Sequence, residues 1–274
     1  MFFTKMHGLG NDFVIINHLD ECISLDKEKI RFLCHRKYGI GSDGLIIVNS
    51  SKEAMIKMSY YNADGNEVEM CGNGIRCFAK YVYDNGIIED NFITVETLAG
   101  IKEIEVILNG EKVQNVKVNM GAPIYQGKNI PIKIDKELVI DEQLIYNELT
   151  VNFSSLSMGN PHVVVQVEDM ENYPKEEIGD FIEHHPLFPK GTNVNFCKIM
   201  NRNLIQVVTW ERGVGLTSAC GTGTCATVAI LLKKGLLNHK VDAQLPGGHL
   251  FIEVQNNVFM TGEAVYVFSG EIQV

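Results

Sequence analysis

The chain has 274 residues, of which 45% are hydrophobic and 21% charged, and its formal net charge at pH 7 is −10. This acidic balance argues against a nucleic-acid partner, which needs a basic surface, although a locally positive site could still bind an anionic small molecule. The length is enough for two domains, the composition is that of a globular protein, and no apolar run is long enough to cross a membrane.

Short runs rich in β-branched residues predict strands, and longer amphipathic or apolar runs predict helices. In the first half, strands are expected over 13–17, 45–48, 55–61, 92–96, 101–108 and 112–120, with helices over 24–37 and 72–85. In the second half, strands are expected over 163–167, 207–210, 250–254 and 264–268, with helices over 175–184 and 221–234. The helix over 221–234 is apolar on every side, which indicates that it is buried. The polar stretch near 120–150 is the expected crossover.

The two halves are copies of one pattern, offset by 149 residues. Gly10-Asn11 corresponds to Gly159-Asn160, and Cys71-Gly72-Asn73-Gly74 corresponds to Cys220-Gly221-Thr222-Gly223. We therefore expect an α+β fold of two pseudo-symmetric domains, each a curved, mainly antiparallel, barrel-like sheet around a central buried helix. The expected domains are 1–118 and 119–262, with a terminal strand at 263–274 returning to the first. Such facing domains would place a small-ligand site between them.

The cysteines do not form a disulfide framework. There are seven: Cys22, Cys34, Cys71, Cys77, Cys197, Cys220 and Cys225. An odd number, and an N-terminal segment without the pattern of a secretory signal, indicate a reducing cytoplasm. Only Cys71 and Cys220 occupy equivalent positions, each immediately before a Gly-x-Gly turn that opens a predicted helix. The other five are expected to be small buried core residues.

The opening of a helix suits both a carboxylate and a reactive thiol, because its first backbone N–H groups lack internal partners and the helix dipole favours negative charge. A carboxylate held by N–H groups around Gly72, Asn73, Gly221 and Thr222 would place an adjacent α-carbon between the thiols. Cys71 and Cys220 therefore predict a thiolate–thiol pair that inverts the α-carbon of an amino acid without a cofactor.

Other chemistries fit the same residues less well. Cys71 with Cys77, and Cys220 with Cys225, have poor spacing for zinc, and no metal site is expected. Gly221–Ala226 matches a dinucleotide fingerprint with Asp242 downstream, but a lone match is weak and the parallel βαβ context is missing. No lysine pattern requires a pyridoxal Schiff base.

The motifs that carry these residues resemble those of the diaminopimelate epimerase family. They are KMHGLGNDF (5–13), YNADGNEVEMCGNGIRCFAKY (61–81), NMGAP (119–123), SMGNPH (157–162), TNVNF (192–196), WERGVGLTSACGTGTCA (210–226) and LPGGHL (245–250). The resemblance implies that LL- and meso-diaminopimelate are interconverted for lysine and peptidoglycan synthesis, with Cys71 and Cys220 as the acid/base pair. It also implies a cytoplasmic homodimer that needs no cofactor and binds diaminopimelate as its small-molecule substrate.

The resemblance further implies a set of substrate-binding residues: Asn11, Asn62, Gly72, Asn73, Asn160, Asn193, Glu211, Arg212, Gly221 and Thr222. In this set, Glu211 and Arg212 would recognise the distal ammonium and carboxylate, since a bidentate arginine suits a carboxylate. His162 and Glu211 would support catalysis. Their alternative roles are a structural histidine after a Gly-Asn-Pro turn and an ordinary solvated carboxylate.

Two departures from the family pattern bear on substrate choice. Leu216 stands where many members have glutamate, and Gly44 lies where some have glutamine. A cofactor-independent racemase of another amino acid, such as histidine, therefore stays open as an alternative. A thiol-based redox or metal module and a nicotinamide enzyme are the more distant alternatives.

Overall fold

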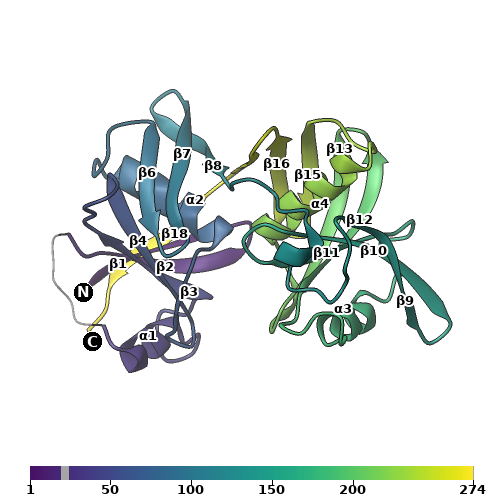
Figure 1. Cartoon of the computed structure of the whole chain (residues 1–274). Helices are drawn as coiled ribbons and strands as arrows, with labels where there is room; N and C mark the ends of the chain where they lie inside the picture. Colours follow the sequence, from purple (N-terminus) through teal and green to yellow (C-terminus); the bar gives the residue numbers. More distant parts are fainter. Residues whose placement is uncertain (20–24, 274) are drawn as a thin grey trace. The chain divides into compact units, whose positions relative to one another are not determined.

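The computed structural model describes residues 1–19 and 25–273, and it is a mixed α+β fold built mostly of strands, as predicted (Figure 1). The chain forms two compact units. The first contains Met1–Asn119 and Thr261–Val274, and the second contains Met120–Met260. Cys22 and the start of the helix expected from residue 24 lie outside the described residues.

The first unit is built on one sheet with the strand order β18–β1–β2–β3–β4–β6–β7–β8. The pairs β2–β3 and β4–β6 are parallel and the others antiparallel, while the short β5 pairs with β4. The strands are β1 (Phe2–Gly8), β2 (Asn11–Asn17), β3 (Gly44–Asn49), β4 (Ile56–Asn62), β5 (Glu67–Val68), β6 (Phe92–Thr97), β7 (Gly100–Asn109), β8 (Lys112–Asn119) and β18 (Val265–Glu271). The helices are α1 (Lys27–Cys34) and α2 (Gly72–Asp84).

The second unit repeats this arrangement with the strand order β9–β10–β11–β12–β13–β15–β16. Here β11–β12 and β13–β15 are the parallel pairs, and the short β14 pairs with β13. The strands are β9 (Val139–Tyr146), β10 (Leu149–Ser157), β11 (Pro161–Gln166), β12 (Asn193–Asn201), β13 (Leu204–Glu211), β14 (Gly215–Thr217), β15 (Lys240–Leu245), β16 (Gly248–Val254) and β17 (Val258–Gly262), the last of which runs on into the first unit. The helices are η1 (Gly127–Asn129), α3 (Lys175–Glu183) and α4 (Gly221–Lys233).

The sequence duplication extends to strand register. Phe13 pairs with Gly44 in the first unit, and His162 pairs with Asn193 in the second. Both residues of the second pair lie 149 positions after those of the first. The two sheets therefore hold equivalent residues at equivalent places, so a difference between two matched residues is a local substitution in one common framework.

One helix is central to each unit. Helix α2 packs against β1, β2, β3, β4, β7 and β8, and α4 packs against β10, β11, β12, β13 and β16. Ten of the thirteen residues of α4 are buried, which explains why its sequence is apolar on every side. Both helices end just before a glycine with positive φ, Gly86 or Gly235, a backbone conformation that glycine adopts at little cost.

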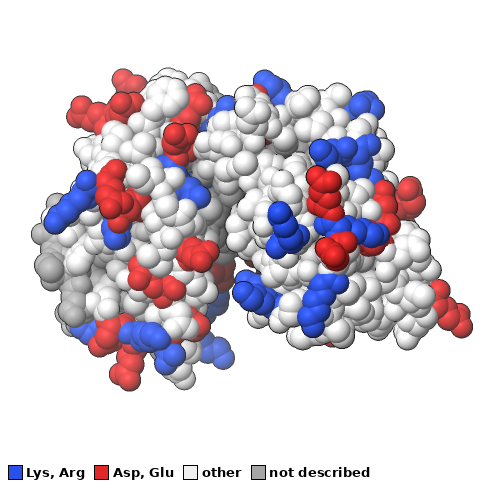
Figure 2. Space-filling view, viewed as in Figure 1, with Lys and Arg blue, Asp and Glu red and all other residues white. Residues whose placement is uncertain are grey.

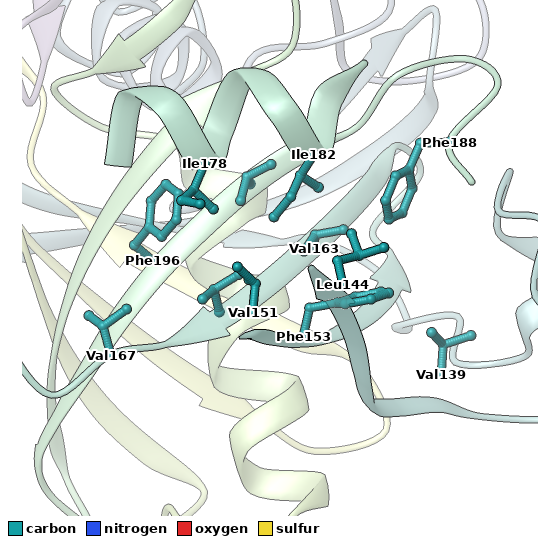
Figure 3. Close-up of a cluster of buried hydrophobic side chains, with 12 residues drawn as sticks. Val139, Leu144, Val151, Phe153, Val163, Val167, Ile178, Ile182, Phe188 and Phe196 are labelled. Atoms are coloured by element: carbon teal, nitrogen blue, oxygen red, sulfur yellow. The ribbon is translucent and has the colours of Figure 1, made fainter. Parts of the chain in front are cut away.

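Helix α3 covers the sheet of the second unit on the side away from α4 and closes a separate apolar cluster (Figure 3). Ile178 and Ile182 point from the helix toward Val163 and Phe196 on the sheet. Full burial of one such side chain contributes roughly 1.5–3 kcal/mol. The β11–β12 edge, where several predicted site residues lie, is thus fixed by a packed core beneath it.

The predicted boundaries differ from the structure in three places. The helix expected over 24–37 ends at Cys34, because the chain turns at His35, whose N–H bonds to the Phe32 carbonyl. The crossover near 120–150 is too long, since residues 139–146 form β9. Strands β1, β5, β10, β12, β14, β15 and β17 were not predicted as strands, although β15, for example, alternates polar and apolar residues in KVDAQL.

On the face shown in Figure 2, acidic and basic side chains are intermixed over both units. Among the described residues, no helix has the length and apolar character needed to cross a bilayer.

Candidate active site

Cys71 caps the N-terminus of α2 in an extended conformation and is half-buried. Its thiol donates to Asn11 Oδ1 over 3.5 Å, and Asn73 Nδ2 donates to the same oxygen over 3.3 Å. Three residues of the predicted site, from the start of β2 and the start of α2, therefore meet in the first unit. Asn62, also predicted, lies exposed at the end of β4.

Asn11 is held by an ionic cluster at the start of β2. Asn11 Nδ2 donates to Asp43 Oδ2 over 2.7 Å, while Arg36 bonds to both Asp12 and Asp43. Lys5 Nζ lies 2.8 Å from Asp12 Oδ2. Burial of Asp12 disfavours its ionised form, but the bonds to Arg36 and Lys5 outweigh burial and hold the pKa of this carboxyl well below its usual range. The ionised cluster thus fixes the orientation of the Asn11 amide.

Arg76, which the sequence did not single out, contacts residues of the predicted site. It is fully buried on α2, and its guanidinium donates to Gly72 O (3.0 Å) and Asn73 Oδ1 (3.1 Å). The bond to Oδ1 turns the Asn73 amide so that Nδ2 faces Asn11. Gly8 lies against the guanidinium. A β-carbon at this position would lie only 3.0 Å from the Arg76 Nη2 atom, so a larger residue would crowd it. The signal in the sequence is a lone arginine on the apolar face of a buried helix.

Cys220 caps α4 in the same way that Cys71 caps α2, and it is buried. Its Sγ atom lies 3.6 Å from Thr222 Oγ1, at the position equivalent to Asn73. In each unit, a polar side chain two residues after the cysteine therefore lies on the first helical turn near the sulfur or its hydrogen-bond partner. Gly72 and Gly221 are both buried at the first helical position.

His162 is fully buried at the start of β11. Its Nε2 atom lies 2.9 Å from Asn160 Oδ1, and its Nδ1 atom lies 3.3 Å from Asn195 Nδ2. Burial, with a smaller contribution from the charge of Arg212, lowers the pKa of His162 to about 3. His162 is therefore neutral at physiological pH, and its contacts within the unit connect Asn160 to the interior.

This shifted pKa predicts a loss of stability on acidification. The unfolded chain takes up a proton at His162 near its ordinary pKa of 6.5, whereas the folded chain does so only near 3. The contribution of neutral His162 to the free energy of unfolding is therefore complete above pH 6.5. It falls as the pH is lowered toward 3, by up to about 1.4 kcal/mol per pH unit. Urea unfolding at pH 7, 6 and 5 measures the slope.

The variant His162→Gln should show a smaller slope, whereas His184→Gln, on the exposed end of α3, should show an equal or steeper one, because the backbone hydrogen bond to Asp180 raises the pKa of His184. Equal slopes in the wild type and in His162→Gln would contradict the assignment. The ionic cluster at Asp12 interferes little with this measurement. Most of the stability that ionised Asp12 contributes is lost only when the pH drops below about 4.

Asn193, Glu211 and Arg212 lie close together at one edge of the second unit. Asn193 Nδ2 donates to Pro161 O (3.0 Å), and Asn193 Oδ1 accepts from the Arg212 backbone N–H (3.1 Å). The Arg212 side chain is exposed and one of its N–H groups donates to Lys190 O. Glu211 accepts from Thr217 Oγ1 over 2.6 Å. Asn193 therefore connects the segment that carries Glu211 and Arg212 to Pro161, the residue between Asn160 and His162.

The duplicated framework explains one of the departures. Gly44 is the equivalent of Asn193, and a β-carbon at Gly44 would lie 2.5 Å from Tyr60 Cε2 and 2.7 Å from Tyr61 O. A longer side chain therefore does not fit at Gly44 with Tyr60 in this position. Leu216, the other departure, lies partly exposed on β14 opposite Trp210.

The remaining cysteines in the described part of the chain, Cys34, Cys77, Cys197 and Cys225, are all buried. Burial raises the pKa of the Cys77 and Cys197 thiols to about 12 and also raises that of Cys34. These groups stay protonated, as expected of core residues. Within residues 1–19 and 25–273, no three His, Cys, Asp or Glu side chains gather into a group that could hold a metal ion.

Known proteins are similar to this chain in sequence or in fold. The family described as diaminopimelate epimerase matches residues 3–126 and 154–267. The diaminopimelate epimerase of Moorella thermoacetica is 48% identical over 99% of both chains, and that of Methanococcus maripaludis strain C6 is 44% identical over 100% of both. A hydroxyproline epimerase from Agrobacterium vitis shares the fold with a TM-score of 0.73 at 14% identity, covering 98% of this chain and 91% of its own. A PhzF-family phenazine biosynthesis protein from Bacillus anthracis has a TM-score of 0.71 at 18% identity, covering 100% and 99%. The family match and the full-length identity to its curated members lead to one conclusion: this chain belongs to the diaminopimelate epimerase family.

Proposed function

We propose that this protein interconverts LL- and meso-diaminopimelate, with Cys71 and Cys220 as its acid/base pair. One observation carries the proposal. Two cysteines occupy equivalent N-cap positions on the central helices of two duplicated units, in a chain 44–48% identical to curated diaminopimelate epimerases. Each cysteine precedes Gly-x-Gly, so both helix openings offer backbone N–H groups to an anion.

In the proposed reaction, one cysteine acts as a thiolate and the other as a thiol. The thiolate takes the α-proton, so the C–H bond breaks, an S–H bond forms and the electron pair is left on the substrate. The substrate carboxylate is held by N–H groups around Gly72, Asn73, Gly221 and Thr222, which stabilise the developing enolate-like charge. The second thiol then delivers its proton to the opposite face of the carbon.

Recognition of the distal end is assigned to residues that break the duplication. Asn62 in the first half corresponds to Glu211 in the second, and Arg212 follows directly. Arg212 supplies a forked donor for the distal carboxylate, and Glu211 supplies an acceptor for the distal ammonium. Asn11, Asn62, Asn160 and Asn193 complete the set with amides that both donate and accept. His162 and Glu211 support catalysis.

Proton exchange tests the reaction directly. The purified protein is incubated in D2O with LL-diaminopimelate and no added cofactor, and deuterium at the α-carbon is followed by NMR and mass spectrometry. We expect deuterium to enter together with conversion to the meso isomer. If diaminopimelate does not exchange while histidine or another amino acid does, the racemase alternative replaces this proposal.

Arg212→Gln is expected to raise KM for diaminopimelate about 10- to 100-fold with a smaller change in kcat, because a charged hydrogen bond to the distal carboxylate is lost. Lysine, which lacks this carboxylate, serves as a competing ligand. The ratio of the inhibition constant for lysine to the KM for diaminopimelate should fall in the variant. Steady-state kinetics with Arg202→Gln, another arginine of the second unit, provide the control, and unchanged KM in Arg212→Gln would contradict the assignment.

The proposal includes a cytoplasmic homodimer that needs neither metal nor organic cofactor. Light scattering on the purified protein measures its mass in solution, and a mass of one chain would refute the dimer. Dialysis against a chelator, followed by the exchange assay, tests the cofactor requirement. Activity lost on dialysis and restored by a metal ion would contradict it.

A further inference from the structure

A buried polar set lies directly beneath Cys220. It consists of His162, Asn195 and Thr209, which are 0%, 0% and 2% exposed. A β-carbon at Gly223, one turn into α4, would lie 2.1 Å from Asn195 Oδ1 and 3.2 Å from Cys220 Sγ. The Asn195 side chain therefore occupies the space under the first helical turn, next to the thiol.

The first unit has apolar and aromatic residues at the same three places. Phe13, Ile46 and Tyr60 lie 149 positions before His162, Asn195 and Thr209. The registers agree, because Ile46 pairs with Tyr60 and Asn195 pairs with Thr209. Burying an amide in place of an aliphatic chain costs free energy unless its hydrogen bonds are made. The polar set is therefore not required by the fold, which forms without it in the first unit.

One contact fixes the direction of every hydrogen bond in this set. Asn195 Nδ2 lies 2.9 Å from the backbone carbonyl of Val163, which can only accept. The Asn195 amide therefore faces Val163 with its nitrogen, and its oxygen accepts from Thr209 Oγ1 over 3.0 Å. The second hydrogen on Nδ2 is directed at His162 Nδ1. That ring nitrogen must accept, so the proton of the neutral imidazole resides on Nε2.

The protonated Nε2 donates to Asn160 Oδ1 over 2.9 Å. This bond engages the amide oxygen of Asn160 and directs its Nδ2 hydrogens away from the histidine. The exposed side of Asn160 is then a hydrogen-bond donor. A donor suits a carboxylate or carbonyl oxygen and disfavours an ammonium group.

We propose that Asn195 is a positioning residue that locks His162 in the Nε2–H tautomer and thereby makes Asn160 a donor to an oxygen of the substrate. The inference rests on the proposed function, because Asn160 acts on a ligand only if the chain binds one there. Asn195 itself contacts no substrate. The neutral imidazole that the lock needs agrees with the low pKa of His162.

The tautomer is measured first on the wild-type protein. Long-range 1H–15N correlation of 15N-histidine-labelled protein at pH 7 distinguishes the two tautomers and the imidazolium, and His162→Gln identifies the signals of His162. We expect a neutral ring with its proton on Nε2. A proton on Nδ1, or an imidazolium, overturns the proposal whatever the activity.

The variant Asn195→Leu then tests the link to the substrate. Leucine is close in shape to asparagine, and the equivalent place in the first unit accommodates Ile46 beneath Gly74. Without the donor to Nδ1, both tautomers should be populated, and KM for diaminopimelate should rise about tenfold while kcat changes by less than about threefold. Thr209→Val is the matched control: it removes one bond of the set but keeps both donations from Nδ2.

We expect Thr209→Val to lower stability while leaving the tautomer and KM unchanged. If Asn195→Leu changes neither the tautomer nor KM beyond the values of Thr209→Val, the positioning role is overturned. If the wild type does not bind or epimerise diaminopimelate, the proposed function fails, and the tautomer spectrum still decides whether the lock exists.

Discussion

Replacing Cys71 or Cys220 with alanine is expected to lower kcat for diaminopimelate by about 10³-fold or more, since each thiol transfers a proton at the α-carbon. Both variants should fold. Each cysteine lies at an N-cap without a side-chain capping bond, so truncation removes little structure. Steady-state epimerisation, with circular dichroism to verify the fold, measures the effect. Any residual α-deuteration should be confined to one of the two stereoisomers, because only one face keeps its base.

Cys77→Ala and Cys225→Ala are the matched controls. They lie on the same two helices, six and five residues after the proposed pair, and both are buried. Their loss should cost stability but leave kcat within about threefold of the wild type. Normal turnover in either Cys71→Ala or Cys220→Ala would overturn the two-thiol mechanism. A similar loss in the controls would indicate a general effect of disturbing the helix.

The helices were the most predictable elements, because α2 and α4 carry clear stop signals at Gly86 and Gly235. Strand β10 was missed for a physical reason. Its buried serines, Ser154, Ser155 and Ser157, resemble a loop in composition, yet their hydroxyls find partners inside the unit. Ser155 Oγ, for example, donates to His162 O over 2.9 Å. Local composition does not reveal a polar side chain that tertiary structure satisfies.

The same limit applies to the candidate site. Cys71 and Cys220 could be predicted as a pair because a duplication in the sequence marks them as equivalent, which requires no knowledge of packing. Arg76 and Asn195 were not found, since their importance depends on being buried against particular backbone carbonyls. The duplication contained a signal for Asn195 all the same. A polar residue aligned with a strand isoleucine, Ile46, marks a place where the two units differ in chemistry.

Gly223→Ala is expected to destabilise the protein by about 3 kcal/mol, because the new β-carbon would lie 2.1 Å from Asn195 Oδ1. Asn195 would have to move, and its bonds to Val163 and Thr209 would weaken while these groups stay buried. The helix-forming preference of alanine offsets at most about 1 kcal/mol of this cost. Urea unfolding measures the change, and kcat should fall as well, since Cys220 Sγ lies 3.2 Å from the added atom.

Gly74→Ala makes the same change at the equivalent place in the first unit. There the added β-carbon would meet Ile46 Cδ1 at 3.1 Å and Phe13 Cε1 at 3.4 Å, and the first of these is the end of a flexible side chain. We expect a change of less than about 1 kcal/mol in either direction. The comparison isolates the buried amide, because both glycines lie three residues after a cysteine on matched helices. If Gly223→Ala lowered the free energy of unfolding as little as Gly74→Ala does, the clash with Asn195 would relax freely. The rigid polar set beneath Cys220 would then have to be abandoned.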